Sequence, residues 1–153
     1  MSASELDRAL EQEVMRLCAL GESHFEYGEA ALALQHCQQA WALIPEPRTG
    51  KRISAVVLAM IGDCHLELEQ DHKAQEAFTL ALQCHGAKDD PLLHLRLGMV
   101  CHELDQHDSA RQHLARADAL NDADHGDADD PVYAALLKSK IPLSPGHPLP
   151  AAR

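Results

Sequence analysis

Aromatic side chains are scarce in this sequence of 153 residues, because Phe, Tyr and Trp together make up only 3% of it. Alanine and leucine are abundant instead, and both favour helices. Long apolar runs are also missing, since the longest, Ala55 to Gly62, is far too short to cross a bilayer. These features indicate closely packed helices in one domain that is large enough to have a core of its own.

Basic residues are outnumbered, with 13 Lys and Arg against 24 Asp and Glu, so the net charge is −11. This balance argues against nucleic acid or an anionic membrane as a partner and suits a basic protein partner. The N-terminus, Met1 to Asp7, has no basic region followed by an apolar core, so we expect no signal peptide. Five cysteines without CxxC spacing indicate a reducing, cytoplasmic environment rather than a disulfide framework.

A pattern of small and apolar residues recurs three times along the chain, with its members three and four residues apart. The central copy is Leu58-Ile61-Gly62-His65, then Ala74-Phe78-Ala81 and Gly86. The upstream copy is Leu17-Leu20-Gly21-His24, then Ala33-Cys37-Ala40 and Pro45. The downstream copy is His94-Leu97-Gly98-Cys101, then Ala110-Leu114-Ala117 and Asp122. This spacing predicts two helices in each copy, joined by a tight turn. The glycines allow the second helix to approach the first, and the alanines face them.

The pattern resembles the tetratricopeptide repeat (TPR), which implies an all-α fold, an α-solenoid of three helix hairpins. The repeats cover about 14–45, 55–86 and 91–122. Gly21 and Gly62 are 41 residues apart, against a usual period of about 34, and a Pro/Gly loop from Pro45 to Lys51 takes up the surplus. His24, His65 and Cys101 stand where the family usually has Tyr. The family binds many unrelated partners, so the resemblance is specific for fold and not for function.

The repeats form part of a single predicted domain over residues 1–140. Ser2 or Ser4 can cap the first helix, Asp71 is expected to cap the fourth, and Asp90-Pro91 is a clear start signal for the fifth. An acidic loop is expected from Asn121 to Asp130, followed by a capping helix over about 131–140 that covers the open end of the stack. Residues 141–153 contain four prolines and are expected to form a flexible tail.

The family resemblance also implies a binding surface, because the first helix of each hairpin lines the concave face of such a solenoid. The expected partner-binding residues are Met15, Cys18, Glu22, Phe25, Glu26, Val56, Ala59, Asp63, Leu66, Glu67, Leu92, Leu95, Met99, His102 and Glu103. This lining is apolar with a row of carboxylates, so it suits an apolar segment that carries Lys or Arg. The alternative is that some of these residues pack against the first helix's extension or the tail, and that the carboxylates form a solvated face.

Family members that grip the carboxylate of a chaperone tail use Lys, Asn and Arg. The corresponding residues here are Cys18, Glu22, Met60, Leu92 and Arg96, of which only Arg96 fits. Since Glu22 repels a carboxylate, a carboxylate-tail adaptor is disfavoured.

Metal binding and catalysis find little support in the sequence. Four of the 11 histidines adjoin a cysteine, but neighbours on a helix point about 100° apart and do not converge on one ion. The loop that follows Asn121 resembles a calcium loop in composition only, since the sixth residue from Asp122 is Asp127 rather than Gly. No GxSxG, HExxH or phosphate-loop motif is present. We therefore expect a chain that is not an enzyme and has no metal or cofactor.

A second resemblance suggests a role. The stretches Ile61-Gly62-Asp63, His94 to Gly98 and Asp129 to Lys138 are similar to a group of small bacterial repeat proteins that act as immunity partners in polymorphic toxin systems. This implies a cytoplasmic protein that blocks a secreted toxin, and the acidity would suit a basic toxin such as a nuclease. Type III secretion chaperones, which are also small, acidic and built of about three repeats, are the alternative, followed by a general assembly adaptor. The oligomeric state stays open.

Overall fold

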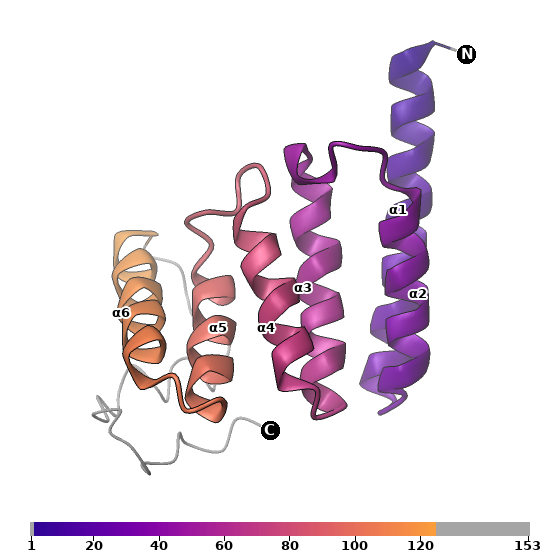
Figure 1. The fold of residues 1–153 in the computed structure, drawn as a ribbon. Coiled ribbons are helices and arrows are strands. Elements are labelled where there is room, and N and C mark those ends of the chain that lie inside the picture. Colours follow the sequence, from indigo (N-terminus) through magenta and orange to yellow (C-terminus); the bar gives the residue numbers. More distant parts are fainter. Residues whose placement is uncertain (1, 125–153) are drawn as a thin grey trace. The chain divides into compact units, whose positions relative to one another are not determined.

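The computed structural model describes residues 2–124 of the chain, and over this range it is built of α-helices and one short 3-10 helix. The helices are α1 (Ala3–Glu26), α2 (Ala30–Leu43), η1 (Arg48–Gly50), α3 (Arg52–Glu67), α4 (Asp71–Leu82), α5 (Pro91–Glu103) and α6 (His107–Asp124) (Figure 1). The chain divides between Lys88 and Asp89 into two compact units. The first unit holds α1 to α4, and the second holds α5 and α6.

In the first unit, two helical hairpins pack against each other. The hairpins are α1–α2 and α3–α4, and α3 also contacts both α1 and α2. Their shared core is apolar and consists of Val14, Leu17, Cys18, Cys37, Ala40, Ile44, Val57, Ile61 and Ala77. In the second unit α5 packs along α6, and Leu114 of α6 lies between two small buried clusters. The predicted all-α solenoid of helical hairpins is confirmed by this architecture.

The repeated glycines lie where the two helices of a hairpin come closest. A Cβ atom on Gly21 would lie 2.8 Å from Sγ of Cys37, and one on Gly62 would lie 2.5 Å from the ring of Phe78. A Cβ atom on Gly98 would lie 2.5 Å from Cγ of Leu114. A Cβ atom does not approach another non-bonded heavy atom so closely. Each glycine therefore allows its two helices to pack at this distance, as the sequence pattern predicted.

The three hairpin turns share one backbone geometry. Gly28, Glu69 and Asp105 each adopt a positive φ, of 79°, 58° and 60°. In each turn the next residue's N–H donates back to a carbonyl of the first helix, as Gln70 does to His65 at 2.8 Å. The sequence predicted a turn at Gly28, whereas Glu69 and Asp105 carry side chains in a conformation that usually costs about 1 kcal/mol or more.

Two of the predicted helix starts are confirmed and one is wrong. Ser2 forms a capping box with Glu5, and the Leu92 N–H donates to the Asp90 carboxylate at 2.9 Å. Asp71, predicted as a cap, is instead the first residue of α4. The N-cap position of α4 is occupied by Gln70, whose side chain contacts His65 and does not cap the helix. The Asp71 carboxylate still lies in the first turn, where the helix dipole favours a negative charge.

The surplus residues between the first two hairpins form an ordered loop around Arg48. Its guanidinium lies 5.3 Å from the Trp41 ring and donates to the Ile44 carbonyl at 2.9 Å and to the Glu46 carboxylate at 2.8 Å. Ser54 Oγ donates to the Arg48 carbonyl, which ties the loop to the start of α3. The loop therefore holds the end of α2 and the start of α3 in one arrangement.

The C-terminal predictions are tested only in part. α6 extends to Asp124, so the first four residues of the acidic loop predicted from Asn121 are helical instead. The rest of that loop, the predicted capping helix over 131–140 and the predicted tail over 141–153 lie outside the described residues. The single domain predicted over 1–140 stays a prediction.

We predict that Gly62→Ala lowers the free energy of unfolding by at least about 1 kcal/mol, because the clash with the buried Phe78 ring outweighs the better helix propensity of Ala. Urea unfolding followed by circular dichroism measures this. Gly50→Ala is the matched control, since the nearest atom to its Cβ would be 3.8 Å away, and it should be near neutral. Equal stabilities of the two variants would contradict the packing role assigned to Gly62.

Candidate functional site

The predicted binding residues of the first unit lie on α1 and α3, and most of them reach solvent. Met15 and Val56 occupy corresponding positions on the two helices and are 48% and 46% exposed. Glu22, Glu26 and Glu67 are exposed, whereas Phe25, Ala59, Asp63 and Leu66 are half-buried. Cys18 is only 3% exposed because it belongs to the core of this unit, so it offers no surface to a partner.

The second unit shows the same division along α5. Leu92 is 51% exposed and Glu103 is exposed, while Met99 and His102 are half-buried. Leu95 is fully buried, with Ala117, Met99 and Leu114 in its cluster. Like Cys18, it therefore serves packing rather than contact. Whether the remaining predicted residues bind a partner stays a prediction.

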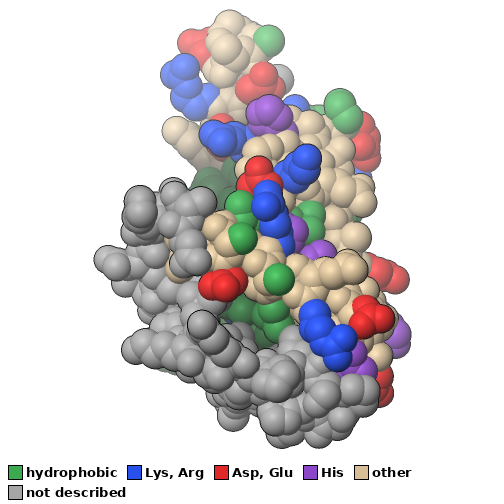
Figure 2. All heavy atoms as spheres, turned by 90° about the vertical axis from the view of Figure 1, so that its left-hand side faces the viewer, with side chains coloured by type: hydrophobic (Ala, Val, Ile, Leu, Met, Phe, Trp, Pro, Cys, Tyr) green, Lys and Arg blue, Asp and Glu red, His purple; other side chains and the backbone are tan. Residues whose placement is uncertain are grey.

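The exposed carboxylates at these positions are not engaged in ion pairs within residues 2–124. Within the described residues Glu22, Glu26, Glu67 and Glu103 form no ion pair, whereas Glu13 of α1 pairs with Arg16 at 2.6 Å. Figure 2 shows one face of the molecule, on which acidic, basic and histidine side chains are interspersed. Net charge alone therefore does not mark a site, and unpaired carboxylates beside exposed apolar side chains are the more specific feature.

The five cysteines are buried and form no disulfide. Burial, together with the neighbouring Cys37 and Glu22, raises the pKa of Cys18 to about 11. The hydrogen bond between Cys37 and Cys64 is the main cause that raises the pKa of Cys37, and burial adds to it. Burial also raises the pKa of Cys84. A thiol that stays protonated and shielded is a poor nucleophile, which supports a packing role for Cys18, Cys37 and Cys84. The same hydrogen bond with Cys37 lowers the pKa of Cys64, which is buried beside it. Within residues 2–124 no three His, Cys, Asp or Glu side chains are grouped so that they could hold a metal ion.

Histidines pair with one another inside the hairpins. The rings of His24 and His36 stack with centroids 5.1 Å apart and an angle of 8° between their planes. His94 and His113 face each other through their Nδ1 atoms at 3.1 Å, so one of the two nitrogens donates and the other accepts. His65, at one of the Tyr positions of the repeat, lies 2.7 Å from the Gln70 side chain through its own Nδ1. These histidines thus contribute ring packing and hydrogen bonds within the hairpins.

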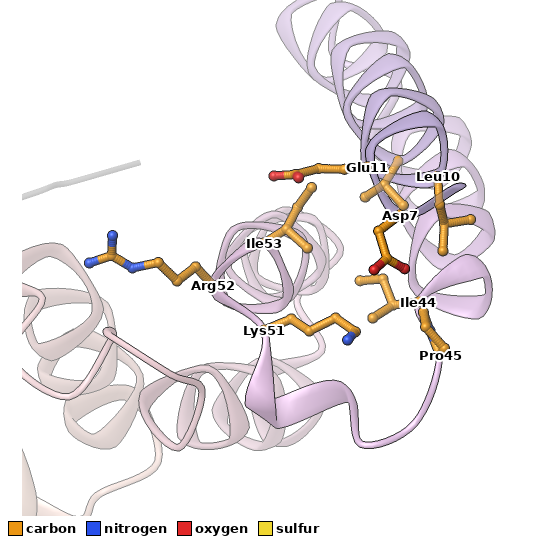
Figure 3. Close-up of a pocket in the computed structure, with 9 residues that line it drawn as sticks. Asp7, Leu10, Glu11, Ile44, Pro45, Lys51, Arg52 and Ile53 are labelled. Atoms are coloured by element: carbon orange, nitrogen blue, oxygen red, sulfur yellow. The ribbon is translucent and has the colours of Figure 1, made fainter. Parts of the chain in front are cut away.

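The structure contains a cavity that was not predicted from the sequence. It lies in the first unit between the N-terminal half of α1, the end of α2 and the start of α3, and has a volume of about 220 Å³ (Figure 3). None of its lining residues belongs to the predicted binding set. One sequence feature is related to this cavity. The first helix is longer than a repeat requires, and its extra turns form one wall of the cavity.

Comparisons with known proteins identify the fold. No family model and no curated protein sequence matches the chain. Among solved structures it is similar to the first TPR of Spaghetti (RPAP3) bound to the HSP90 peptide SRMEEVD, with a TM-score of 0.67 and 15% sequence identity. The similarity covers 84% of this chain and 90% of that one. A TPR-like fold is therefore shown. No helix within residues 2–124 combines the length and the apolar character that a membrane span requires.

The His94–His113 pair predicts acid sensitivity of the second unit. Burial and the neighbouring His94 lower the pKa of His113 below its ordinary value of 6.5. The unfolded chain therefore takes up this proton first as the pH falls, and stability that is fully present above about pH 6.5 is lost below it. His113→Gln removes the titration, so this variant should lose less unfolding free energy than the wild type between pH 7.5 and 5.5.

Urea unfolding at the two pH values measures this difference. His72→Gln is the matched control, because it also replaces one imidazole, at an exposed position of α4 outside the second unit. It should show the wild-type loss. If His113→Gln loses as much stability as the wild type, the buried pair is not what makes the protein sensitive to acid.

Proposed function

We propose that this chain is a non-enzymatic protein-binding module that captures one specific protein partner with side chains of its first helices. The observation that carries the proposal is the combination of exposed apolar side chains with unpaired carboxylates on those helices. Met15, Val56, Glu22 and Glu67 provide it in the first unit, and Leu92 and Glu103 provide it in the second. Apolar contact supplies affinity, and the carboxylates select partners of opposite charge.

The partner is expected to carry Lys or Arg close to apolar side chains. The peptide bound to the structural neighbour, SRMEEVD, has the opposite character, with two Glu and one Asp against a single Arg. The unpaired Glu22 at a carboxylate-binding position of the family would repel such a peptide. The shared fold therefore accompanies a different preference for the charge of the ligand.

We further propose that the partner is a secreted toxin and that the chain acts as its immunity protein in the cytoplasm. Support comes from the resemblance to small bacterial immunity proteins and from the net charge of −11, which favours a basic toxin and speeds its capture. Five free cysteines are compatible with a reducing compartment. Capture works by steric occlusion, so it requires no catalytic residue in this chain.

The second candidate function is a chaperone of the type III secretion kind. The exposure of Met15, Val56 and Leu92 favours it, because a set of solvent-facing apolar side chains suits an extended apolar segment of a translocator. The two functions differ in what is captured, a folded toxin domain or an unfolded segment. A general assembly adaptor, which would recognise a short peptide motif, ranks third.

A tagged pull-down from the native host, followed by mass spectrometry and co-expression, distinguishes these functions. A single stoichiometric partner with a toxin domain, whose toxicity is relieved when this chain is co-expressed, is the expected result. A partner that is insoluble alone and rich in apolar segments would replace the immunity function with the chaperone function. Many weak partners would contradict both.

We predict that the triple variant Glu22→Lys, Glu67→Lys, Glu103→Lys weakens partner binding at least tenfold, because three favourable charges become repulsive toward a basic partner. Tenfold corresponds to about 1.4 kcal/mol, a modest sum for three charge contacts. Isothermal titration calorimetry with the identified partner measures the change. None of the three carboxylates has a partner within the described residues, so the fold should be retained.

The control triple variant is Glu69→Lys, Glu76→Lys, Asp118→Lys, which changes the net charge equally at exposed residues outside the predicted binding set. It should bind with nearly wild-type affinity. Equal weakening by both variants would mean that only net charge matters. Unchanged affinity of the folded first variant would rule out the first-helix carboxylates as the binding surface.

A further inference from the structure

Two imidazole nitrogens face each other between the helices of the second unit. Nδ1 of His94, on α5, lies 3.1 Å from Nδ1 of His113, on α6, and the two ring centroids are 5.4 Å apart. His94 is only 8% exposed, and His113 is half-buried. The fold therefore brings together two side chains that are 19 residues apart in the sequence and that belong to the commonest type of metal ligand.

The separation of these two nitrogens is close to that of two ligands on one metal ion. Imidazole nitrogens bind Zn²⁺ at about 2.0–2.1 Å, and in a tetrahedral arrangement two of them then lie roughly 3.3 Å apart. The 3.1 Å between His94 and His113 has to grow only slightly to reach this value. Rotation of each ring about its terminal side-chain torsion, which is soft, turns the two nitrogens toward an ion beside the line that joins them.

Two other imidazole pairs of the described chain lack this convergence. The rings of His24 and His36 are stacked with 8° between their planes, so their nitrogens lie side by side and do not point at a common centre. The rings of His102 and His107 meet at 70°, and neither Nδ1 atom has a hydrogen-bond partner, so these two nitrogens do not face each other. The pair between α5 and α6 is thus the one with the geometry of a chelate.

We propose that His94 and His113 bind a divalent transition-metal ion of the zinc type through their Nδ1 atoms, so that the ion bridges α5 and α6. Such ions prefer imidazole nitrogen, and the net charge of −11 favours the approach of a cation. In the metal-free pair one Nδ1 donates a proton to the other. On binding, that imidazole carries its proton on Nε2 instead, so both Nδ1 atoms coordinate the ion and neither ring changes its charge.

The site has two protein ligands, and water completes the coordination. Within residues 2–124 no three His, Cys, Asp or Glu side chains are grouped so that they could hold a metal ion, and the half-buried His113 gives solvent access to the pair. We therefore expect weaker binding than at a closed site with four protein ligands. The site is independent of the partner-binding function, because neither histidine belongs to the predicted binding set.

An ion at this position would tie together two helices that otherwise meet through small apolar clusters. In the described residues these clusters contain Leu95 with Ala117 and Cys101 with Ala110. A ligand that binds the folded state and not the unfolded chain stabilises the fold by mass action. Metal binding would therefore raise the stability of the second unit without a new protein contact.

The test is isothermal titration calorimetry of the full chain, freed of metal with a chelator, against Zn²⁺. We expect one site of this kind, and Zn²⁺ at ten times its dissociation constant should raise the melting temperature by about 3 °C or more. Mg²⁺, which prefers oxygen ligands, should have no such effect. Long-range ¹H–¹⁵N spectra should show both rings with the proton on Nε2 and both Nδ1 resonances shifted by the metal.

The double variant His94→Gln, His113→Gln should raise the dissociation constant for Zn²⁺ at least tenfold and remove the rise in melting temperature. The matched control is His72→Gln, His85→Gln, which also removes two imidazoles, at exposed positions of the first unit, and should bind Zn²⁺ like the wild type. Circular dichroism checks that each variant is folded. If the double variant at the pair does not fold, His113→Gln alone replaces it, and the spectra of the wild type decide independently.

Absence of saturable Zn²⁺ binding to the wild type overturns the proposal. Equal binding by the two double variants also overturns it, because the metal would then bind adventitiously to other histidines. Nδ1 resonances of His94 and His113 that do not respond to Zn²⁺ contradict it in the same way. Each of these results leaves the proposed partner-binding function untouched, because the metal is titrated into the isolated chain.

Discussion

The close approach of the two helices in each hairpin is the constraint on which the rest of this structure depends. At Gly21, Gly62 and Gly98 there is no room for a Cβ atom, because the side chains of Cys37, Phe78 and Leu114 on the second helices lie against the backbone of the first. Small residues complete the contact beside them, since Ala33, Ala74 and Ala110 are fully buried.

Imidazoles make contacts within the hairpins where the repeat pattern usually has aromatic rings. His24 and His36 stack, His65 contacts Gln70, and His94 contacts His113, each pair joining the two helices of a hairpin or its turn. An imidazole fills the space of a small ring but can gain a charge near neutral pH, which a phenyl or phenol ring does not. At the contact between His94 and His113, where burial and the neighbouring His94 lower the pKa of His113, helix packing is therefore coupled to pH.

Two surfaces of the first unit combine apolar and charged side chains, and they differ in the signs of their charges. The first-helix surface around Met15, Glu22 and Glu67 carries charge of one sign beside apolar side chains, which suits a partner of opposite charge. The cavity between α1, the end of α2 and the start of α3 is lined by charges of both signs, among them Asp7 and Lys51.

The amino-acid sequence by itself determined the number of hairpins in the described chain, their approximate boundaries and the glycine contacts, because regular spacing of small residues permits few other arrangements. Tertiary structure alone decided which predicted binding residues reach solvent. Cys18 and Leu95 were predicted as binding residues together with the exposed Met15 and Leu92 on the same helices, yet they are buried because adjacent helices cover them. It also decided the positive φ of Glu69 and Asp105 and brought Asp7 near Lys51, since both depend on how separate helices meet and no local sequence pattern records that meeting.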